Sequence, residues 1–153
     1  MNKVIIIMGS KSDLSWAQDI SKVLDKLGID YVLRVASAHK VPLKCYDIIK
    51  EYEKENVVFI TIAGRSNALS AFTDAQTYCP VIACPPYSDR FGGADIFSSL
   101  RAPTGVAPLV VLEPEGAAIA AAKILGLSDV TIQDKVKEYQ KIMRETIQKD
   151  DNE

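Results

Sequence analysis

The sequence predicts a single α/β domain built on a five-stranded parallel β-sheet. Short, continuously apolar runs alternate along the chain with longer stretches in which apolar residues recur at helical spacing. An apolar run without polar alternation is typical of a parallel strand that helices cover on both faces, and regular alternation of strands with helices favours such a sheet. Five strands in 153 residues fit a flavodoxin-like three-layer αβα sandwich that spans 1–153, with an additional helix at the C-terminus.

The first half of the chain contains three of these strands. Residues 3–8 are apolar and rich in β-branched side chains, which favours a buried strand. Apolar residues over 14–27 then repeat at helical spacing, and Gly28 follows where a C-cap glycine is expected. Pro42 stands near the first position of the second helix. The other predicted elements of this half are a strand at 31–36, a helix at 42–55, a strand at 57–63 and a helix at 68–77.

The second half completes the sheet and adds the last helix. A short strand at 81–84 is stopped by Pro85 and Pro86, and the loop at 87–94, which contains Gly92 and Gly93, is expected on the side of the candidate site. The remaining elements are a helix at 95–101 with Asp95 as a candidate cap, a strand at 109–112, an alanine-rich helix at 113–125 closed by Gly126, a helix at about 132–147 and a frayed tail at 149–153. The sheet leaves nothing for the last helix to cover, so its apolar stripe is expected to dock on another subunit.

Composition excludes several classes of protein. The formal net charge of −2 argues against a general nucleic-acid binder, and no apolar run approaches the ~20 residues that a membrane span needs. No signal peptide is visible after Met1, so a cytoplasmic protein is expected. Three cysteines with a single histidine match no metal-ligand spacing, which predicts reduced, buried thiols and no metal site.

The candidate site follows from where the first three strands end. In a parallel sheet the carboxyl ends of the strands share one edge, so the turns that follow them converge. The first turn contains Gly9, Ser10, Ser12 and Asp13. A glycine followed by hydroxyls at a helix start can cradle a phosphate, and a carboxylate can accept hydrogen bonds from ribose hydroxyls. The alternative is that Ser12 or Asp13 caps the helix. Neither a Walker loop nor a GxGxxG motif is present.

The second turn contains the only histidine of the chain, in Ser37-Ala38-His39-Lys40. A histidine side chain titrates near neutrality and suits general acid–base work, and Lys40 can hold a phosphate or carboxylate as a point charge. The alternative for His39 is a hydrogen-bonded structural residue, and for Lys40 an idle surface cation.

The third turn, Gly64-Arg65-Ser66-Asn67, offers donors to an anion. The planar guanidinium of Arg65 fits a carboxylate bidentately, Ser66 and Asn67 add donors, and Gly64 permits close approach of the backbone. The alternative is a simple helix cap beside an exposed arginine. The fourth turn, with its two prolines, is expected to add a rigid apolar wall without chemistry. Together these turns predict proton-coupled chemistry on an anionic, phosphorylated substrate, without a metal or bound cofactor.

These turns resemble those of the PurE family of purine biosynthesis. The matching stretches run in order through the chain: Met8-Gly9-Ser10-Lys11-Ser12-Asp13, Ser37-Ala38-His39-Lys40, Ala63-Gly64-Arg65-Ser66-Asn67-Ala68-Leu69, Cys84-Pro85-Pro86 and Ser98-Ser99-Leu100-Arg101-Ala102-Pro103-Thr104-Gly105. Class I members of the family rearrange N5-carboxyaminoimidazole ribonucleotide (N5-CAIR) and carry a histidine-containing third turn. Class II members carboxylate aminoimidazole ribonucleotide (AIR) directly with CO2, and their third turn reads AGRSN, as here.

The resemblance therefore implies an AIR carboxylase of class II, a carboxy-lyase that forms 4-carboxy-AIR (CAIR) without ATP, biotin or metal. It implies that His39 moves the C4 proton, that Ser10, Ser12, Asp13 and Ser37 bind the ribose phosphate, and that Gly64, Arg65, Ser66 and Lys40 stabilise the new carboxylate. It also implies a homo-oligomer, an octamer or else a tetramer.

Two alternatives stay open at this point. The first is an N5-CAIR mutase of class I. The second is a flavodoxin-like nucleotide-binding or signalling module, although a receiver domain would need an aspartate at the end of the third strand, where Gly64 and Arg65 stand.

Overall fold

The computed structural model describes residues 2–151 and contains the predicted sheet. All pairings between neighbouring strands are parallel, and the strands lie in the order β2-β1-β3-β4-β5. The sheet consists of β1 (Asn2–Met8), β2 (Asp30–Val35), β3 (Asn56–Ile62), β4 (Val81–Ala83) and β5 (Leu109–Val110). In this order β2 lies on one side of β1, and β3, β4 and β5 follow on the other, as in a flavodoxin-like fold.

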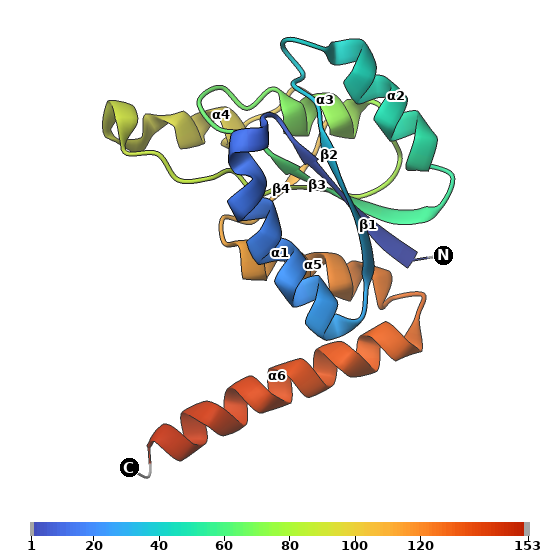
Figure 1. Cartoon of the computed structure of the whole chain (residues 1–153), viewed down its shortest axis with the longest axis vertical. Coiled ribbons are helices and arrows are strands. Elements are labelled where there is room, and N and C mark those ends of the chain that lie inside the picture. The colour runs from blue at the N-terminus through green and yellow to red at the C-terminus, as the bar shows by residue number, and fades with distance from the viewer. Residues whose placement is uncertain (1, 152–153) are drawn as a thin grey trace.

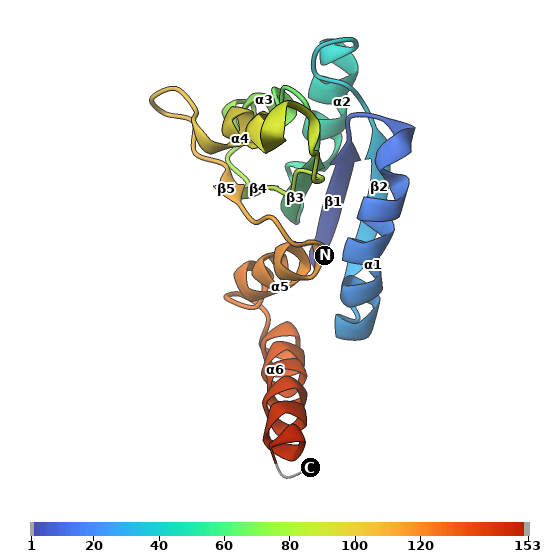
Figure 2. The same cartoon turned by 90° about the vertical axis from the view of Figure 1, so that its left-hand side faces the viewer.

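Helices cover both faces of the sheet, as Figures 1 and 2 show. They are α1 (Leu14–Leu27), α2 (Pro42–Tyr52), α3 (Leu69–Ala75), α4 (Phe97–Leu100), α5 (Pro114–Leu125) and α6 (Val130–Asp150), with short 3₁₀ segments η1 (Lys11–Asp13) and η2 (Arg90–Ile96). The pleat of a strand sends successive side chains to opposite faces. In β1, Ile6 therefore packs in the core beneath α1 and α5, and Ile5 packs in the core beneath α2 and α3.

The predicted element boundaries agree with the structure to within three residues for the strands and for α1 and α2. Gly28 adopts the left-handed conformation (φ 62°) after α1 and donates its N–H to Asp25 and Leu24, and Pro42 opens α2. The expectation of buried thiols is confirmed for all three cysteines. Burial raises the pKa of Cys84 to about 12, so this residue stays a neutral thiol.

Three local predictions are wrong. The expected loop at 87–94 turns at Arg90 into a 3₁₀ segment, which runs to Ile96 and leads into α4 inside the range expected to be helical, 95–101. Asp95 does not cap it, because the residue before α4 is Ile96 and no side chain caps that end. The expected frayed tail is helical as far as Asp150; its residues 152 and 153 lie outside the described part of the chain. Charged i, i+3 and i, i+4 pairs along α6 favour this longer helix.

Helix α6 leaves the body of the domain, as expected for a helix with no sheet to cover. Its first turns bury Ile132 and Val136, and the rest of the helix projects away from the sandwich (Figures 1 and 2). Beyond Tyr139 it exposes Ile142, Met143 and Ile147. No helix among residues 2–151 is both long and apolar enough to cross a membrane.

Candidate active site

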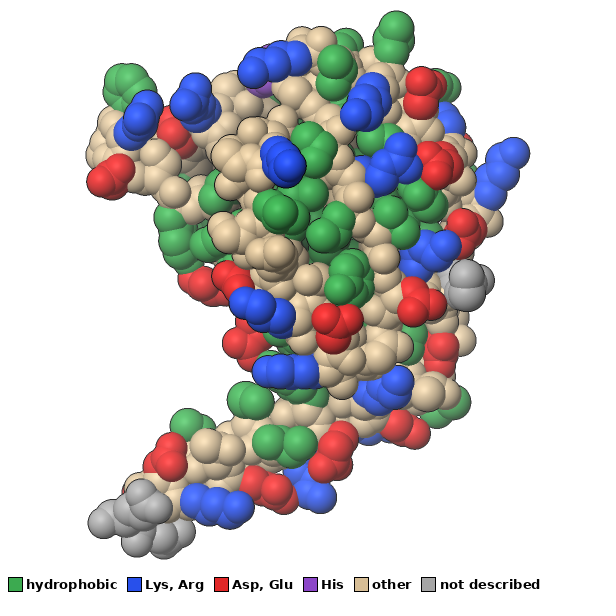
Figure 3. Space-filling model, viewed as in Figure 1, with side chains coloured by type: hydrophobic (Ala, Val, Ile, Leu, Met, Phe, Trp, Pro, Cys, Tyr) green, Lys and Arg blue, Asp and Glu red, His purple; other side chains and the backbone are tan. Residues whose placement is uncertain are grey.

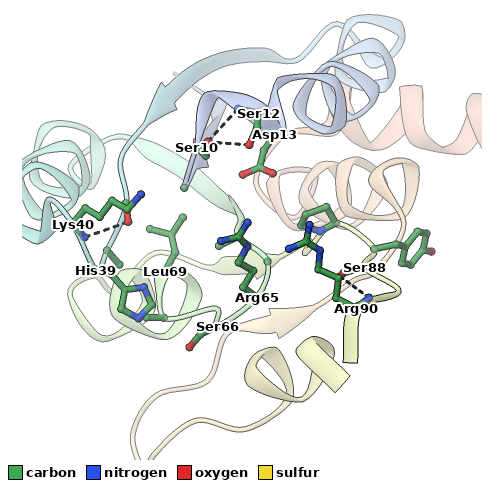
Figure 4. A pocket seen from close by; sticks show the side chains of 18 residues that line it. Ser10, Ser12, Asp13, His39, Lys40, Arg65, Ser66, Leu69, Ser88 and Arg90 are labelled. Carbon is green, nitrogen blue, oxygen red and sulfur yellow. Dashed lines mark hydrogen bonds between the residues drawn. The ribbon is translucent and has the colours of Figure 1, made fainter. Parts of the chain in front are cut away.

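The turns after the first four strands enclose one cavity of about 700 Å³ at the carboxyl edge of the sheet. Figure 4 shows the side chains that line it, and Figure 3 shows Lys and Arg side chains over this end of the molecule, where the single histidine also reaches the surface. Eleven of the twelve residues predicted for the site line the cavity: Gly9, Ser10, Ser12, Asp13, Ser37, Ala38, His39, Lys40, Gly64, Arg65 and Ser66. Asn67 is the exception.

The first turn presents hydroxyls and one carboxylate to this cavity. Ser10 Oγ accepts hydrogen bonds from the N–H of Ser12 at 3.2 Å and from the Ser12 hydroxyl at 2.9 Å. Ser10 therefore caps η1, whereas Asp13 precedes α1 without a side-chain capping bond. Asp13 therefore does not cap α1, and its carboxylate keeps acceptor positions for a ligand beside its bond with the Ser10 backbone. Burial raises the pKa of Asp13, against the opposing effect of a hydrogen bond with the Ser10 backbone.

The second turn is compact and leaves its two chemically active side chains unpaired. Ser37 Oγ accepts the N–H of Lys40 at 3.2 Å, and Ser37 O accepts the N–H of Val41 at 2.9 Å. His39 is exposed, and we find no hydrogen-bond partner for its ring within residues 2–151. The hydrogen-bonded structural role considered for His39 is therefore not seen. Lys40 has no carboxylate within 4.0 Å in the same residues, which leaves its charge free for an anion.

The third turn divides its side chains between the cavity and the protein interior. Arg65 has a left-handed backbone (φ 59°), and both Arg65 and Ser66 are exposed at the cavity. Asn67 is buried, with 4% of its surface exposed. Its Oδ1 accepts the N–H of Ser70 at 3.1 Å and its Nδ2 donates to Ser99 Oγ at 2.9 Å. The structure thus places Asn67 as a support of this turn, outside the cavity lining, because both polar atoms are already satisfied.

The fourth turn contributes more than the expected apolar wall. Pro86 does line the cavity, but Tyr87, Ser88 and Arg90 line it too. The sequence predicted correctly that this loop lies on the side of the site, but Arg90, the cation in the loop, was not among the predicted site residues. The other lining residues not named in advance, Ala63, Ala68 and Leu69, belong to the third turn and to the start of α3.

The donor set of the cavity suits an anion and a proton transfer. It combines three cations, several hydroxyls, one carboxylate and one imidazole. Among residues 2–151, no three His, Cys, Asp or Glu side chains gather as a metal site. The chemistry available to these side chains is therefore binding of anionic groups, stabilisation of a developing negative charge and acid–base catalysis.

Comparisons with known proteins assign the chain to a family. Residues 3–146 match the family model described as AIR carboxylase. A phosphoribosylaminoimidazole carboxylase of Archaeoglobus fulgidus is 61% identical over 151 residues, which cover 99% of this chain and 84% of the relative. One of Treponema denticola is 49% identical and covers 97% and 95%. The human bifunctional phosphoribosylaminoimidazole carboxylase/succinocarboxamide synthetase is 43% identical over 137 residues, which cover 88% of this chain and 32% of the human protein.

The fold comparison agrees. The crystal structure of Treponema denticola PurE superimposes with a TM-score of 0.97 at 48% sequence identity, over 99% of this chain and 98% of that one. Sequence, fold and the cavity at the strand ends thus lead to one assignment: this chain belongs to the AIR carboxylase family.

Proposed function

We propose that this protein is an enzyme of purine biosynthesis that carboxylates AIR reversibly with CO2 to give CAIR, without ATP. The observation that carries the proposal is the convergence of His39 with Lys40, Arg65 and the serines of the first turn in one cavity. The names of the Archaeoglobus and Treponema relatives support the same activity.

The reaction needs few groups, and the cavity supplies them. AIR is an enamine-like aminoimidazole, so its C4 attacks the carbon of CO2, one C=O bond opens to give a carboxylate, and C4 then loses a proton. The serines of the first turn, with Ser37, are proposed to bind the phosphate. Lys40 is proposed to hold the carboxylate or the phosphate as a point charge. Asp13 is proposed to accept the ribose hydroxyls, because its carboxylate keeps acceptor positions beyond the one that the Ser10 backbone uses.

Arg65, with Gly64 and Ser66, is proposed to stabilise the carboxylate as it forms. Such donors lower the barrier because they are already aimed at the place where negative charge develops. His39 takes the C4 proton in the forward direction and returns it in decarboxylation. Holding AIR and CO2 together supplies a further part of the rate enhancement.

The class II assignment rests on Arg65, Ser66 and Asn67 in the third turn and on the absence of a second histidine. It is tested by supplying the purified protein either with AIR and bicarbonate, without ATP, or with N5-CAIR. Rapid CAIR formation from AIR supports the carboxylase. Turnover with N5-CAIR alone would identify an N5-CAIR mutase instead.

The protein is further proposed to work as a homo-oligomer in the cytoplasm, with eight or four subunits. Support comes from the projecting part of α6, where Ile142, Met143 and Ile147 expose apolar surface that a second copy would bury. Sedimentation of the wild type and of Ile142→Glu tests this. A wild-type protein that sediments as a monomer contradicts the proposal.

A further inference from the structure

Two arginines from different turns share one part of the cavity. Figure 4 shows the side chains of Arg65 and Arg90 directed toward the same region, and both residues line the cavity. No carboxylate lies within 4.0 Å of either guanidinium in residues 2–151. Like charges that face a common space repel each other, and an anion between them turns that repulsion into attraction. The arrangement is therefore that of a binding site for an anion.

The position of Arg90 is set by contacts of the segment that carries it. The ring of Tyr87 meets Trp16 edge to face, with centroids 5.3 Å apart and planes at 76°, and its hydroxyl bonds to Glu113. Trp16 in turn donates its indole N–H to Cys84 O at 3.0 Å. The start of the segment is thus fastened to the body of the domain.

The segment then turns back within a few residues. Ser88 Oγ accepts the N–H of Arg90 at 3.2 Å, and the next three residues, Phe91, Gly92 and Gly93, have left-handed backbones. A left-handed backbone is unfavourable for a non-glycine residue such as Phe91. The segment holds this costly turn directly after Arg90, at the edge of the cavity.

The sheet order decides which anion Arg90 can reach. The phosphate donors belong to the turns after β1 and β2, whereas Arg65 follows β3 and Arg90 follows β4 by a few residues. In the order β2-β1-β3-β4, Arg90 therefore comes from the side of Arg65 that faces away from Lys40. A carboxylate has two oxygens with about four acceptor positions, enough for two guanidinium groups.

We propose that Arg90 is a second ligand of the C4 carboxylate, which it binds together with Arg65 in CAIR and in the transition state that leads to it. This rests on the proposed carboxylase function. AIR and CAIR carry the same phosphate and ribose and differ in this carboxylate, so Arg90 contributes to the binding of CAIR and not to that of AIR.

The test compares the wild type with Arg90→Gln. The Kd for AIR is measured by titration calorimetry in CO2-depleted buffer, and kcat/KM for CAIR is measured in the decarboxylation direction. We expect kcat/KM for CAIR to fall about tenfold, as for a lost charge-assisted hydrogen bond, with the Kd for AIR changed by less than about twofold. Lys26→Gln removes an exposed cation from the last turn of α1 and serves as the control for net charge.

Two results overturn the inference. A parallel loss of AIR affinity would make Arg90 a phosphate ligand or a source of general attraction. An unchanged kcat/KM for CAIR would leave it without a role in binding. Either result is compatible with a wild-type enzyme that carboxylates AIR, whereas a wild type that fails to do so contradicts the proposed function itself.

Discussion

The substitution Asn67→Ala distinguishes between two roles of Asn67: support of the third turn and contact with the substrate. The sequence suggests that Asn67 binds substrate, but its amide is buried and bonded to Ser70 and Ser99. Asn67→Ala leaves the N–H of Ser70 without a partner in a position where Ser70 itself is 2% exposed. An unsatisfied buried donor costs ~1–3 kcal/mol, and the lost bond to Ser99 contributes ~1 kcal/mol more. We therefore expect a loss of about 3 kcal/mol in the free energy of unfolding.

Urea unfolding followed by circular dichroism measures this loss. The midpoint should fall without a change in the slope m, because the surface exposed on unfolding is the same. For a chain of this size, about 3 kcal/mol corresponds to a decrease in Tm of about 6–12 °C. Variants must be compared at one protein concentration, since self-association adds to apparent stability.

Asn56→Ala is the matched control. Like Asn67, Asn56 makes two hydrogen bonds through its side chain, both donated, to Asn2 and Ser128. Asn56 is exposed, so water can replace these partners and the free energy of unfolding should change by no more than ~0.5 kcal/mol. A loss below about 1 kcal/mol in Asn67→Ala would refute the supporting role. If the KM for AIR rose at the same time, Asn67 would be a substrate ligand after all.

Three further substitutions test the proposed roles in the cavity. His39→Asn should abolish CAIR formation while AIR still binds in calorimetry, and near-normal turnover would contradict the proton transfer. Arg65→Ala should lower kcat/KM for carboxylation more than it weakens AIR binding; equal losses would indicate a phosphate ligand. Asp13→Asn should weaken AIR binding but raise the urea midpoint at neutral pH. Burial raises the pKa of the Asp13 carboxyl in the folded state, so ionisation opposes folding as the pH rises through that pKa, and the gain should vanish below about pH 4.

The architecture was predictable because it depends on local patterns. Apolar runs without polar alternation indicate parallel strands. The turns that follow parallel strands lie at one edge of the sheet, whatever the order of the strands. That geometry alone brought Ser10, His39 and Arg65 into one cavity from positions far apart in the sequence. The roles of Gly28 at the end of α1 and Pro42 at the start of α2 were equally predictable, because few other residues suit these backbone positions.

Side-chain direction was not predictable from the same patterns. In the third turn Arg65 has a left-handed backbone, and of the two residues that follow, Ser66 lines the cavity while Asn67 is buried. Non-glycine residues rarely adopt a left-handed backbone, and the amino-acid sequence of this turn does not predict one at Arg65. Arg90 was missed for a related reason: its segment turns back on contacts with Trp16 and Glu113, which are distant in sequence.

The distribution of charge in the cavity gives a physical reason for the proposed placement of the phosphate and the carboxylate at different turns. The whole chain has a formal net charge of −2, yet Lys40, Arg65 and Arg90 surround a space with the single carboxylate of Asp13. Because Lys40 and Arg90 come from opposite ends of the four strands, a substrate with one anionic end would find two competing sites. A product with a phosphate and a carboxylate satisfies both ends at once. In the proposed mechanism the third and fourth turns bind the added carboxylate. This group exists only once the C–C bond has begun to form, which is the condition for binding energy to act on the rate.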